Sequence, residues 1–430
     1  MNSKLFYENS DLRNRILFVV FSLLIYRIGT HIPVPIVNIE NIMNRFSVDN
    51  TGIFSLFNLF SGGALSKVTI FSLGVMPYIS ASIIVQLLST IWQPLQNIRK
   101  EGKSGQKKLS EYTRYFAVLI ATFQAFGMSK FMIDLSGLEE VTILHYFIVI
   151  LTLIVGTMFL MWLGEQITEN GIGNGISLII FAGIVSGIPR TIVSTLEKVR
   201  QGEIYVFSIL LLLALFFLVI FFVVYIEMAQ RKILVNYAKR QQGRRLYSAQ
   251  STYLPLKINM AGVIPPIFAS SLILLPITIL QWFDFVNLDN IFADLKLLLY
   301  PGKPLYIFLF GLFIVFFCFF YNNLIFNPKE TADNLKKSGG FIAGIRPGDQ
   351  TAIYINAIVI RLTSIGAVYL TIVSLLPELL VLFVNVPFYF GGTSLLIIVV
   401  VIMDFISQIQ ARLISYKYDN LIKRSKLKSF

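Results

Sequence analysis

The chain has 430 residues, of which 56% are hydrophobic and only 14% are charged, against roughly a quarter in soluble domains. This composition excludes a soluble enzyme. The single cysteine, Cys318, excludes an internal disulfide, and the two histidines, His31 and His145, are too few for a usual zinc or haem site. The net charge of +13 must lie in loops and tails, where anionic lipid, RNA or acidic protein surfaces are the expected partners.

Ten apolar stretches are long enough to cross a bilayer, which takes roughly 20 residues of helix. They cover residues 16–32, 68–92, 115–133, 144–163, 175–193, 205–226, 258–280, 305–326, 352–376 and 388–409. No small-residue cleavage site follows the first stretch, which therefore predicts a membrane helix rather than a signal peptide. These features predict an all-α polytopic membrane protein with both termini on one side.

Basic residues are distributed very unevenly between the two sides of this topology. Of the 36 Lys and Arg residues, 26 lie in the two tails and in the loops after the even-numbered stretches, and eight lie in the opposite loops or at the ends of the stretches beside them. Because cytoplasmic loops carry an excess of basic residues, both termini are expected in the cytosol.

The second stretch is irregular as a membrane helix. In the run from Phe57 to Leu88, which contains most of this stretch, Gly62, Gly63, Gly74 and Pro77 break what should be one helix. Residues such as Lys67 make the first half of the run too polar for lipid. Irregular backbone at membrane depth is tolerated where it is buried in protein or lines a water-filled cavity. We therefore expect a half-helix that re-enters the membrane, a feature that fits a channel or a carrier.

Two cytosolic loops carry most of the remaining information. Residues 227–257 hold seven basic residues and one acid, and Leu234 and Tyr237 are expected on the apolar face of a hairpin. Residues 327–351 begin a helix at Pro328 and end in a Gly-Ile-Arg-Pro-Gly turn. Both loops are interpreted as docking surfaces, although the positive-inside rule alone also explains their basic charge.

Several kinds of catalytic site are excluded by residue type. A His-Glu-x-x-His zinc motif is absent, and neither histidine is placed to serve an intramembrane serine nucleophile. The run Gly102-Lys103-Ser104 resembles the end of a phosphate-binding loop, but Asn97 stands where that motif needs glycine. Any energy from ATP must therefore come from a partner.

A solute carrier remains the stronger rival to a channel at this point. Few ionisable residues lie at mid-membrane depth, where a carrier would bind its solute or coupling ion, namely Asp404 and Arg361. Asp404 can instead pair with a partner at the end of its helix, and Arg361 can extend to the membrane surface. Aliphatic pairs four residues apart stand at equivalent depth, at positions 75 and 79 and at positions 176 and 180. Such pairs usually pack a core, and they can also line a pore.

Seven segments together resemble the SecY family of preprotein translocase channels. In order along the chain they are FNLFSGGALSKVTIFSLGVMPYISASIIVQLL, GEQITENGIGNGISLIIFAGI, VNYAKRQQGRR, STYLPLKINMAGVIPPIFASS, FNPKETADNLKKSGG, GIRPG and PFYFGGTSLLIIVVVIMDF. The resemblance runs from about Leu12 to Arg424 at the expected spacing.

The resemblance implies ten transmembrane helices in two inverted pseudo-symmetric halves of five, residues 1–200 and 201–430, with a plug half-helix over about 60–72. The plug positions are Phe60, Ser61, Gly62, Gly63, Ala64, Leu65 and Ser66. A ring of aliphatic side chains would form the constriction, at Val75, Ile79, Ile176, Ile180, Ile267 and Ile397. The implied lateral gate includes Ser80, Ile83, Gln124 and Asn259.

The resemblance also implies partners. Arg244, Arg245 and Arg346 match basic positions that engage the ribosome or the motor ATPase SecA. SecE and SecG would complete a heterotrimer, and signal sequences, anionic lipids and the accessory proteins SecD, SecF and YidC would be further partners. The implied protein is a channel without cofactor or catalytic residues in a bacterial inner membrane, driven by SecA, ribosomal synthesis or proton-motive force.

Three positions depart from the usual family pattern. Ile36 stands where Gly is usual, Ala343 where Pro is common, and Val75 where Ile is more frequent in the ring. We expect the first two to alter local turn geometry and Val75 to widen the ring slightly. A carrier with a broken-helix site, and an insertase without a transverse pore, remain the alternatives.

Overall fold

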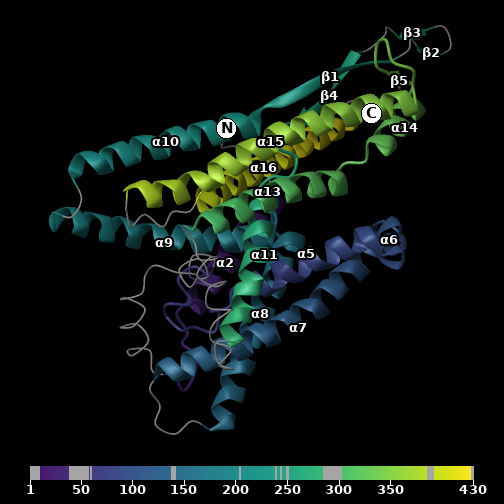
Figure 1. Ribbon diagram of the computed structural model, residues 1–430. Coiled ribbons are helices and arrows are strands. Elements are labelled where there is room, and N and C mark those ends of the chain that lie inside the picture. The colour runs from purple at the N-terminus through teal and green to yellow at the C-terminus, as the bar shows by residue number, and fades with distance from the viewer. Residues whose placement is uncertain are drawn as a thin grey trace.

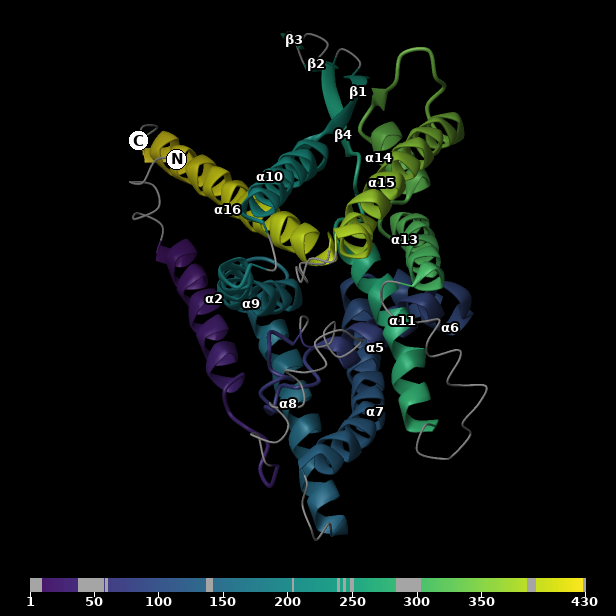
Figure 2. The ribbon, with the colours of Figure 1, turned by 60° about the vertical axis from the view of Figure 1, so that its left-hand side comes forward.

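The computed structural model describes residues 10–37, 58, 61–136, 142–202, 205–237, 240–242, 245–247, 251–283, 303–384 and 392–427. Within these ranges the chain is mostly helical, and the β-strands project from one end of a helical bundle (Figure 1). The end of α16 and the beginning of α2 both lie in the upper half of Figure 2, with the strands above them. The predicted all-α membrane architecture is confirmed.

Each of the ten predicted stretches coincides with a helix. These helices are α2 (Ser10–Gly29), α5 (Met76–Ile91), α7 (Lys103–Ser136), α8 (Ile143–Asn170), α9 (Gly175–Arg200), α10 (Val206–Met228), α11 (Ile264–Phe283), α13 (Pro304–Ile325), α15 (Asp349–Val384) and α16 (Gly392–Leu427). Among the described residues, six helices are long and apolar enough to cross a membrane, and three more are shorter apolar helices. The longest have 36 residues, about 54 Å, so they extend beyond the hydrocarbon core.

Local sequence explains where key helices begin. The side chain of Asn174 accepts hydrogen bonds from the amides of Ile176 (3.1 Å) and Ser177 (3.5 Å), which fixes the start of α9. At the start of α5, Gly74 has a φ of 59° and Pro77 follows in the first helical turn. The positions of these two helix starts determine where the aliphatic pairs of α5 and α9 lie.

The re-entrant segment before α5 folds as consecutive turns over residues 61–75, in place of the half-helix expected there. Gly62 and Gly63 have φ values of 68° and 81°, a conformation that interrupts a right-handed helix. The hydroxyl of Ser72 donates to two carbonyls of the same segment, and such local bonds compete with helical ones.

The two basic loops of the sequence, residues 227–257 and 327–351, form a single structure. Strand β1 (Gln230–Tyr237) pairs antiparallel with β4 (Ser251–Lys257) and with β5 (Gly340–Phe341), in the order β4-β1-β5. Strands β2 (Arg240–Gln242) and β3 (Arg245–Tyr247) pair beyond them (Figure 1). Because β5 follows helix α14 (Pro328–Lys337), the sheet joins the loop 327–351 to the loop 227–257.

One of the two residues expected on the apolar face of the hairpin lies on the other face. Ile233 and Val235 are buried, and Tyr237 packs against their cluster. Leu234 is 42% exposed, because successive side chains of a strand point to opposite faces. The prediction is confirmed for Tyr237 and wrong for Leu234.

A single large apolar cluster fills the centre of the bundle. It joins side chains of the spanning helices to buried side chains of the re-entrant segment, among them Leu65, Val68 and Phe71. The outer faces are also apolar: Phe207 is 76% exposed and Phe221 is 73% exposed on α10. A helix that is apolar on every side is typical of a span in lipid.

Ile36 adopts a conformation that explains why glycine is usual at this position. Its φ is 77°, in the left-handed region that a β-branched side chain rarely enters. The turn therefore has the backbone that a glycine would favour, and Ile36 bears steric strain within it. Ala343 lies exposed in the turn after β5, and no described contact explains its presence there.

We expect Ile36→Gly to raise the free energy of unfolding by about 1 kcal/mol, because glycine takes this φ without strain. Thermal unfolding of the purified protein in detergent measures the change. Ile353, exposed in α15, provides the control: Ile353→Gly should lower the free energy by about 0.5–1 kcal/mol, since glycine weakens a helix interior. An unchanged or lower midpoint for Ile36→Gly would contradict the assignment of strain.

Candidate functional site

The six aliphatic residues predicted to form a constriction come from the beginnings of four helices. Val75 and Ile79 stand at the start of α5, Ile176 and Ile180 at the start of α9, Ile267 in α11 and Ile397 in α16. Five of them are at most 5% exposed, and Ile176 is half-buried. All six belong to the central cluster or pack against it.

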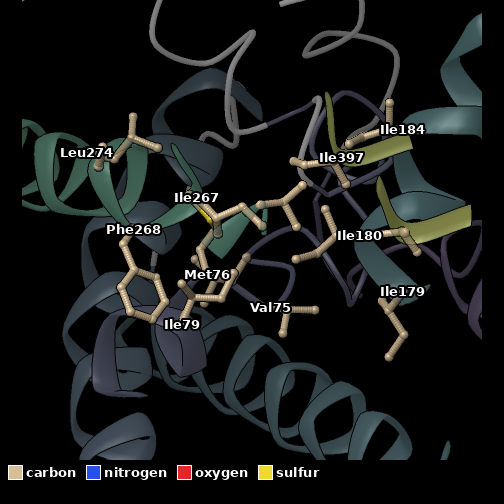
Figure 3. Packing of buried hydrophobic residues seen from close by; sticks show 14 of the residues in the cluster. Val75, Met76, Ile79, Ile179, Ile180, Ile184, Ile267, Phe268, Leu274 and Ile397 are labelled. Atoms are coloured by element: carbon tan, nitrogen blue, oxygen red, sulfur yellow. The ribbon is translucent and has the colours of Figure 1, made fainter. Parts of the chain in front are cut away.

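These side chains converge on one region of the bundle. Figure 3 shows Val75, Ile79, Ile180, Ile267 and Ile397 gathered together from their four helices. Apolar side chains of this size can move aside for a passing polypeptide, and they offer it no fixed polar partner. A narrow apolar constriction also opposes the passage of hydrated ions.

The predicted plug residues lie against the same cluster. Phe60 lies outside the described residues. Ser61, Gly62, Ala64 and Leu65 are buried, whereas Gly63 and Ser66 are half-buried. Because the segment and the constriction share one apolar cluster, displacing the segment would expose that cluster.

The helices expected to form a lateral gate are neighbours. Helix α5, which carries the buried Ser80 and Ile83, contacts both α7 and α11, and α7 also contacts α11 (Figure 2). Between α5 and α11, the hydroxyl of Ser271 lies 4.0 Å from the sulfur of Met76. The seam between these helices is therefore held mainly by apolar packing.

Two polar side chains of these helices are incompletely satisfied. The side-chain oxygens of Gln86 on α5 and Gln124 on α7 are buried without a hydrogen-bond partner in the described part of the chain. A buried polar atom without a partner costs about 1–3 kcal/mol. These two oxygens therefore lower the stability of the packing around them.

Asn259, also predicted at the gate, forms its hydrogen bonds with the second half of the chain. Its Nδ2 donates to the carboxyl oxygen of Glu227 at 2.6 Å and to the carbonyl of Gly262 at 3.1 Å. It also accepts from the Gly262 amide at 3.1 Å. Asn259 thus ties the end of α10 to the corner that precedes α11.

A cavity of about 200 Å³ lies beside this corner. Glu227, Lys257, Asn259 and Asp404 contribute to its lining, together with apolar residues of α9, α11 and α16. The cavity can accommodate polar or charged groups next to the helices that carry the constriction.

The three predicted docking arginines belong to the joined cytosolic loops. Arg346 is exposed in the turn before α15, and its carbonyl accepts a hydrogen bond from Thr351 (3.0 Å). Arg245 begins β3, opposite Gln242. Arg244 lies outside the described residues. The sequence patterns gave no sign of Glu227 as a site residue. Its hydrogen-bond partner Asn259 is 32 residues away, and only the fold brings the two side chains together.

The sequence profile of the SecY family matches residues 69–406. Protein translocase subunit SecY of Escherichia coli (strain K12) is 53% identical over 424 residues, covering 98% of this chain and 96% of that protein. The subunit of the same name from Vibrio cholerae is 53% identical over 426 residues, again covering 98% of this chain and 96% of that protein.

Solved channel structures have a similar fold. A SecY structure whose plug domain is described as stabilising the closed state of the translocation channel has a TM-score of 0.68 at 18% identity, covering 93% of this chain and 92% of that one. Sec61 in a canine ribosome–channel complex has a TM-score of 0.63 at 17% identity, with the same coverage.

We expect Asn259→Ala to lower the free energy of unfolding by about 2 kcal/mol, because the buried carboxyl group of Glu227 loses its partner. Thermal unfolding in detergent measures the loss. The double variant Glu227→Ala/Asn259→Ala should lose less than the sum of the two single variants. Additive losses would show that the two side chains act independently.

Proposed function

The chain belongs to the SecY family, and we propose that it forms the channel through which a bacterial Sec translocase passes unfolded preproteins across the membrane. It is a multi-pass membrane protein and a channel subunit rather than a catalytic enzyme. The observation that carries the proposal is the convergence of Val75, Ile79, Ile180, Ile267 and Ile397 from four helices beside a re-entrant segment that shares their apolar cluster.

In the proposed mechanism, the six aliphatic residues form the pore ring and the segment 60–72 is the plug. A polypeptide of any sequence can pass an apolar ring, because no side chain binds it at a fixed position. Plug and ring together oppose ion flow at rest. The proposed halves, residues 1–200 and 201–430, would each contribute five helices, with the ring between them.

The lateral gate would open between α5 and α11, beside α7. The contacts of α11 with both α5 and α7 support this location. An apolar segment of a signal sequence or membrane protein could then leave through the seam, since a helix with its backbone bonds made is stable in hydrocarbon.

The proposed partners follow from the family and from the charged surface. SecE and SecG would complete the complex, with SecD, SecF and YidC as accessories. The exposed Arg346 and the basic hairpin support docking of SecA or the ribosome, and the ribosome-bound relative named above supports the latter. SecA, ribosomal synthesis or the proton-motive force would supply the energy.

The proposed location is the bacterial inner membrane, with both termini in the cytosol. The excess of basic residues in the tails and in the loops after even-numbered spans supports this orientation. The same basic loops would contact anionic lipids at the cytosolic surface.

The function is tested with proteoliposomes that contain this chain and SecE. The measured quantity is the amount of a labelled precursor that enters the vesicles with ATP and is thereby protected from added protease. We expect protection to require SecA and to fall at least tenfold for Arg346→Glu, because the exposed guanidinium is replaced by an opposite charge. Lys337→Glu, at the end of α14, changes charge equally and should lose less than half of the activity. Saturable uptake of a small solute without protection would support the carrier instead.

Val75 gives a second test of the pore ring. We expect Val75→Ile to lower the resting ion conductance of the channel about twofold, because the longer side chain narrows the ring. Single-channel recordings in planar bilayers measure the conductance. Equal conductance of Val75→Ile and the unmodified channel would count against Val75 as a member of the ring.

A further inference from the structure

The leading residues of the re-entrant segment are held between α2 and α9. The hydroxyl of Tyr26, on α2, donates to the carbonyl of Ser61 at 3.2 Å. The carbonyl of Gly62 accepts from the Arg27 guanidinium at 3.4 Å. The Ser186 hydroxyl of α9 donates to the Gly183 carbonyl of its own helix at 2.7 Å and also lies 3.4 Å from the Gly62 carbonyl. Two helices that are far apart in sequence therefore meet at the Gly62 carbonyl, and α2 also bonds the Ser61 carbonyl.

The backbones of the segment and of α9 also touch directly at two glycines. A Cβ on Gly62 would lie 2.7 Å from the Cα of Gly183 and 2.7 Å from the hydroxyl of Tyr26. A Cβ on Gly183 would lie 3.0 Å from the same hydroxyl and 3.3 Å from the Cα of Gly62. At Gly62 only glycine permits this approach, because its φ is 68° and an added Cβ would overlap the backbone of α9. At Gly183 an added Cβ fits only if its neighbours shift by a few tenths of an ångström.

The trailing end of the segment is held in a different way. The amide of Val34 donates to the carbonyl of Val68 at 2.8 Å, and the amide of Ile70 donates to the carbonyl of Ile32 at 3.1 Å. These are backbone bonds of ordinary length. They join the segment to the chain that leaves α2.

An aromatic side chain strengthens the trailing end. Phe71 is stacked between Tyr26 (ring centroids 6.2 Å apart) and Phe159 of α8 (6.0 Å apart). A Cβ on Gly29 would lie 2.1 Å from the Phe71 ring, and a Cβ on Gly156 would lie 2.0 Å from a carbonyl of the segment. The trailing end is thus seated tightly between α2 and α8.

The leading end is the weaker of the two attachments. In the described part of the chain, its hydrogen bonds to α2 and α9 are 3.2–3.4 Å long, whereas the trailing end combines backbone pairing with a stacked ring. The bonds of Ser61 and Gly62 are therefore the first of these contacts that a displaced segment would lose.

We propose that Tyr26, Gly183 and Ser186 form a plug latch that positions the plug over the pore ring and sets how readily the resting channel opens. The proposal rests on the proposed function of the segment as plug. Tyr26 has two roles within it, because its hydroxyl holds the leading end while its ring packs against the trailing end.

Tyr26→Phe and Gly183→Ala test the latch. The first removes only the hydroxyl and keeps the stacked ring. The second adds a methyl group against Gly62, yet alanine favours a helix over glycine, so loss of α9 would not explain its effect. Tyr369→Phe is the control for the first variant, because the Tyr369 hydroxyl is buried without a hydrogen-bond partner in the described part of the chain. Gly187→Ala, with open space around it on α9, is the control for the second.

The readouts are resting ion conductance of the complete channel complex in planar bilayers and translocation of a precursor with a defective signal sequence. One lost hydrogen bond should raise both about two- to tenfold for Tyr26→Phe. Gly183→Ala should also raise both about two- to tenfold, because the backbone of Gly62 must shift by a few tenths of an ångström from its seat. The two controls should match the unmodified channel, and all variants should translocate an intact precursor.

A variant that lacks residues 61–66 distinguishes failure of the latch from failure of the plug assignment. If the deletion raises conductance while Tyr26→Phe and Gly183→Ala behave like their controls, the latch is wrong and the plug assignment stands. If the deletion leaves conductance unchanged, the plug assignment and the latch both fall. If the unmodified complex translocates no precursor, the proposed function itself is contradicted.

Discussion

Backbone that leaves a helix at membrane depth must find its hydrogen-bond partners inside the protein, and the structure is organised around this constraint. The turns from Ser61 to Val75 meet it with their own hydroxyls, with donors from α2 and α9, and with strand-like backbone bonds to the chain that follows α2, where Val34 bonds Val68 and Ile32 bonds Ile70. Because these partners lie on surrounding helices, on the chain after α2 or within the segment, the bundle can enclose the segment. An irregular segment of this kind could not face lipid.

The same enclosure places the segment against the aliphatic side chains of the proposed pore ring. Their shared apolar cluster means that closure depends on packing, which does not select a particular sequence in a passing chain. The side chains of α2 and α9 that bond the segment, among them Tyr26, meet it at its leading residues Ser61 and Gly62. The hydroxyls of Thr69 and Ser72 bond carbonyls of the segment itself, and these bonds can persist when the segment moves.

Sequence patterns predicted much of this organisation, and their failures have physical causes. Ten apolar stretches predicted ten helices, because crossing hydrocarbon requires a long run of apolar residues. The same reasoning wrongly extended helix into residues 61–75, where positive φ values at glycines and hydroxyl–backbone bonds favour turns. Contacts such as those of Gly62 with Gly183 and Glu227 with Asn259 depend on how distant segments pack, and no local pattern encodes them.

Site-specific cross-linking of an arrested precursor tests the central claim most directly, namely that a translocating chain passes the aliphatic ring. A precursor with one cysteine would be arrested in channels in which the buried Cys318 is replaced by alanine and a cysteine is placed at Ile180 or Ile397. Ile179 and Leu396, equally buried neighbours on the same two helices, provide matched control positions. We predict disulfides with the two ring positions and at most one tenth as much at the controls. Equal or greater cross-linking at Ile179 and Leu396 would contradict the account.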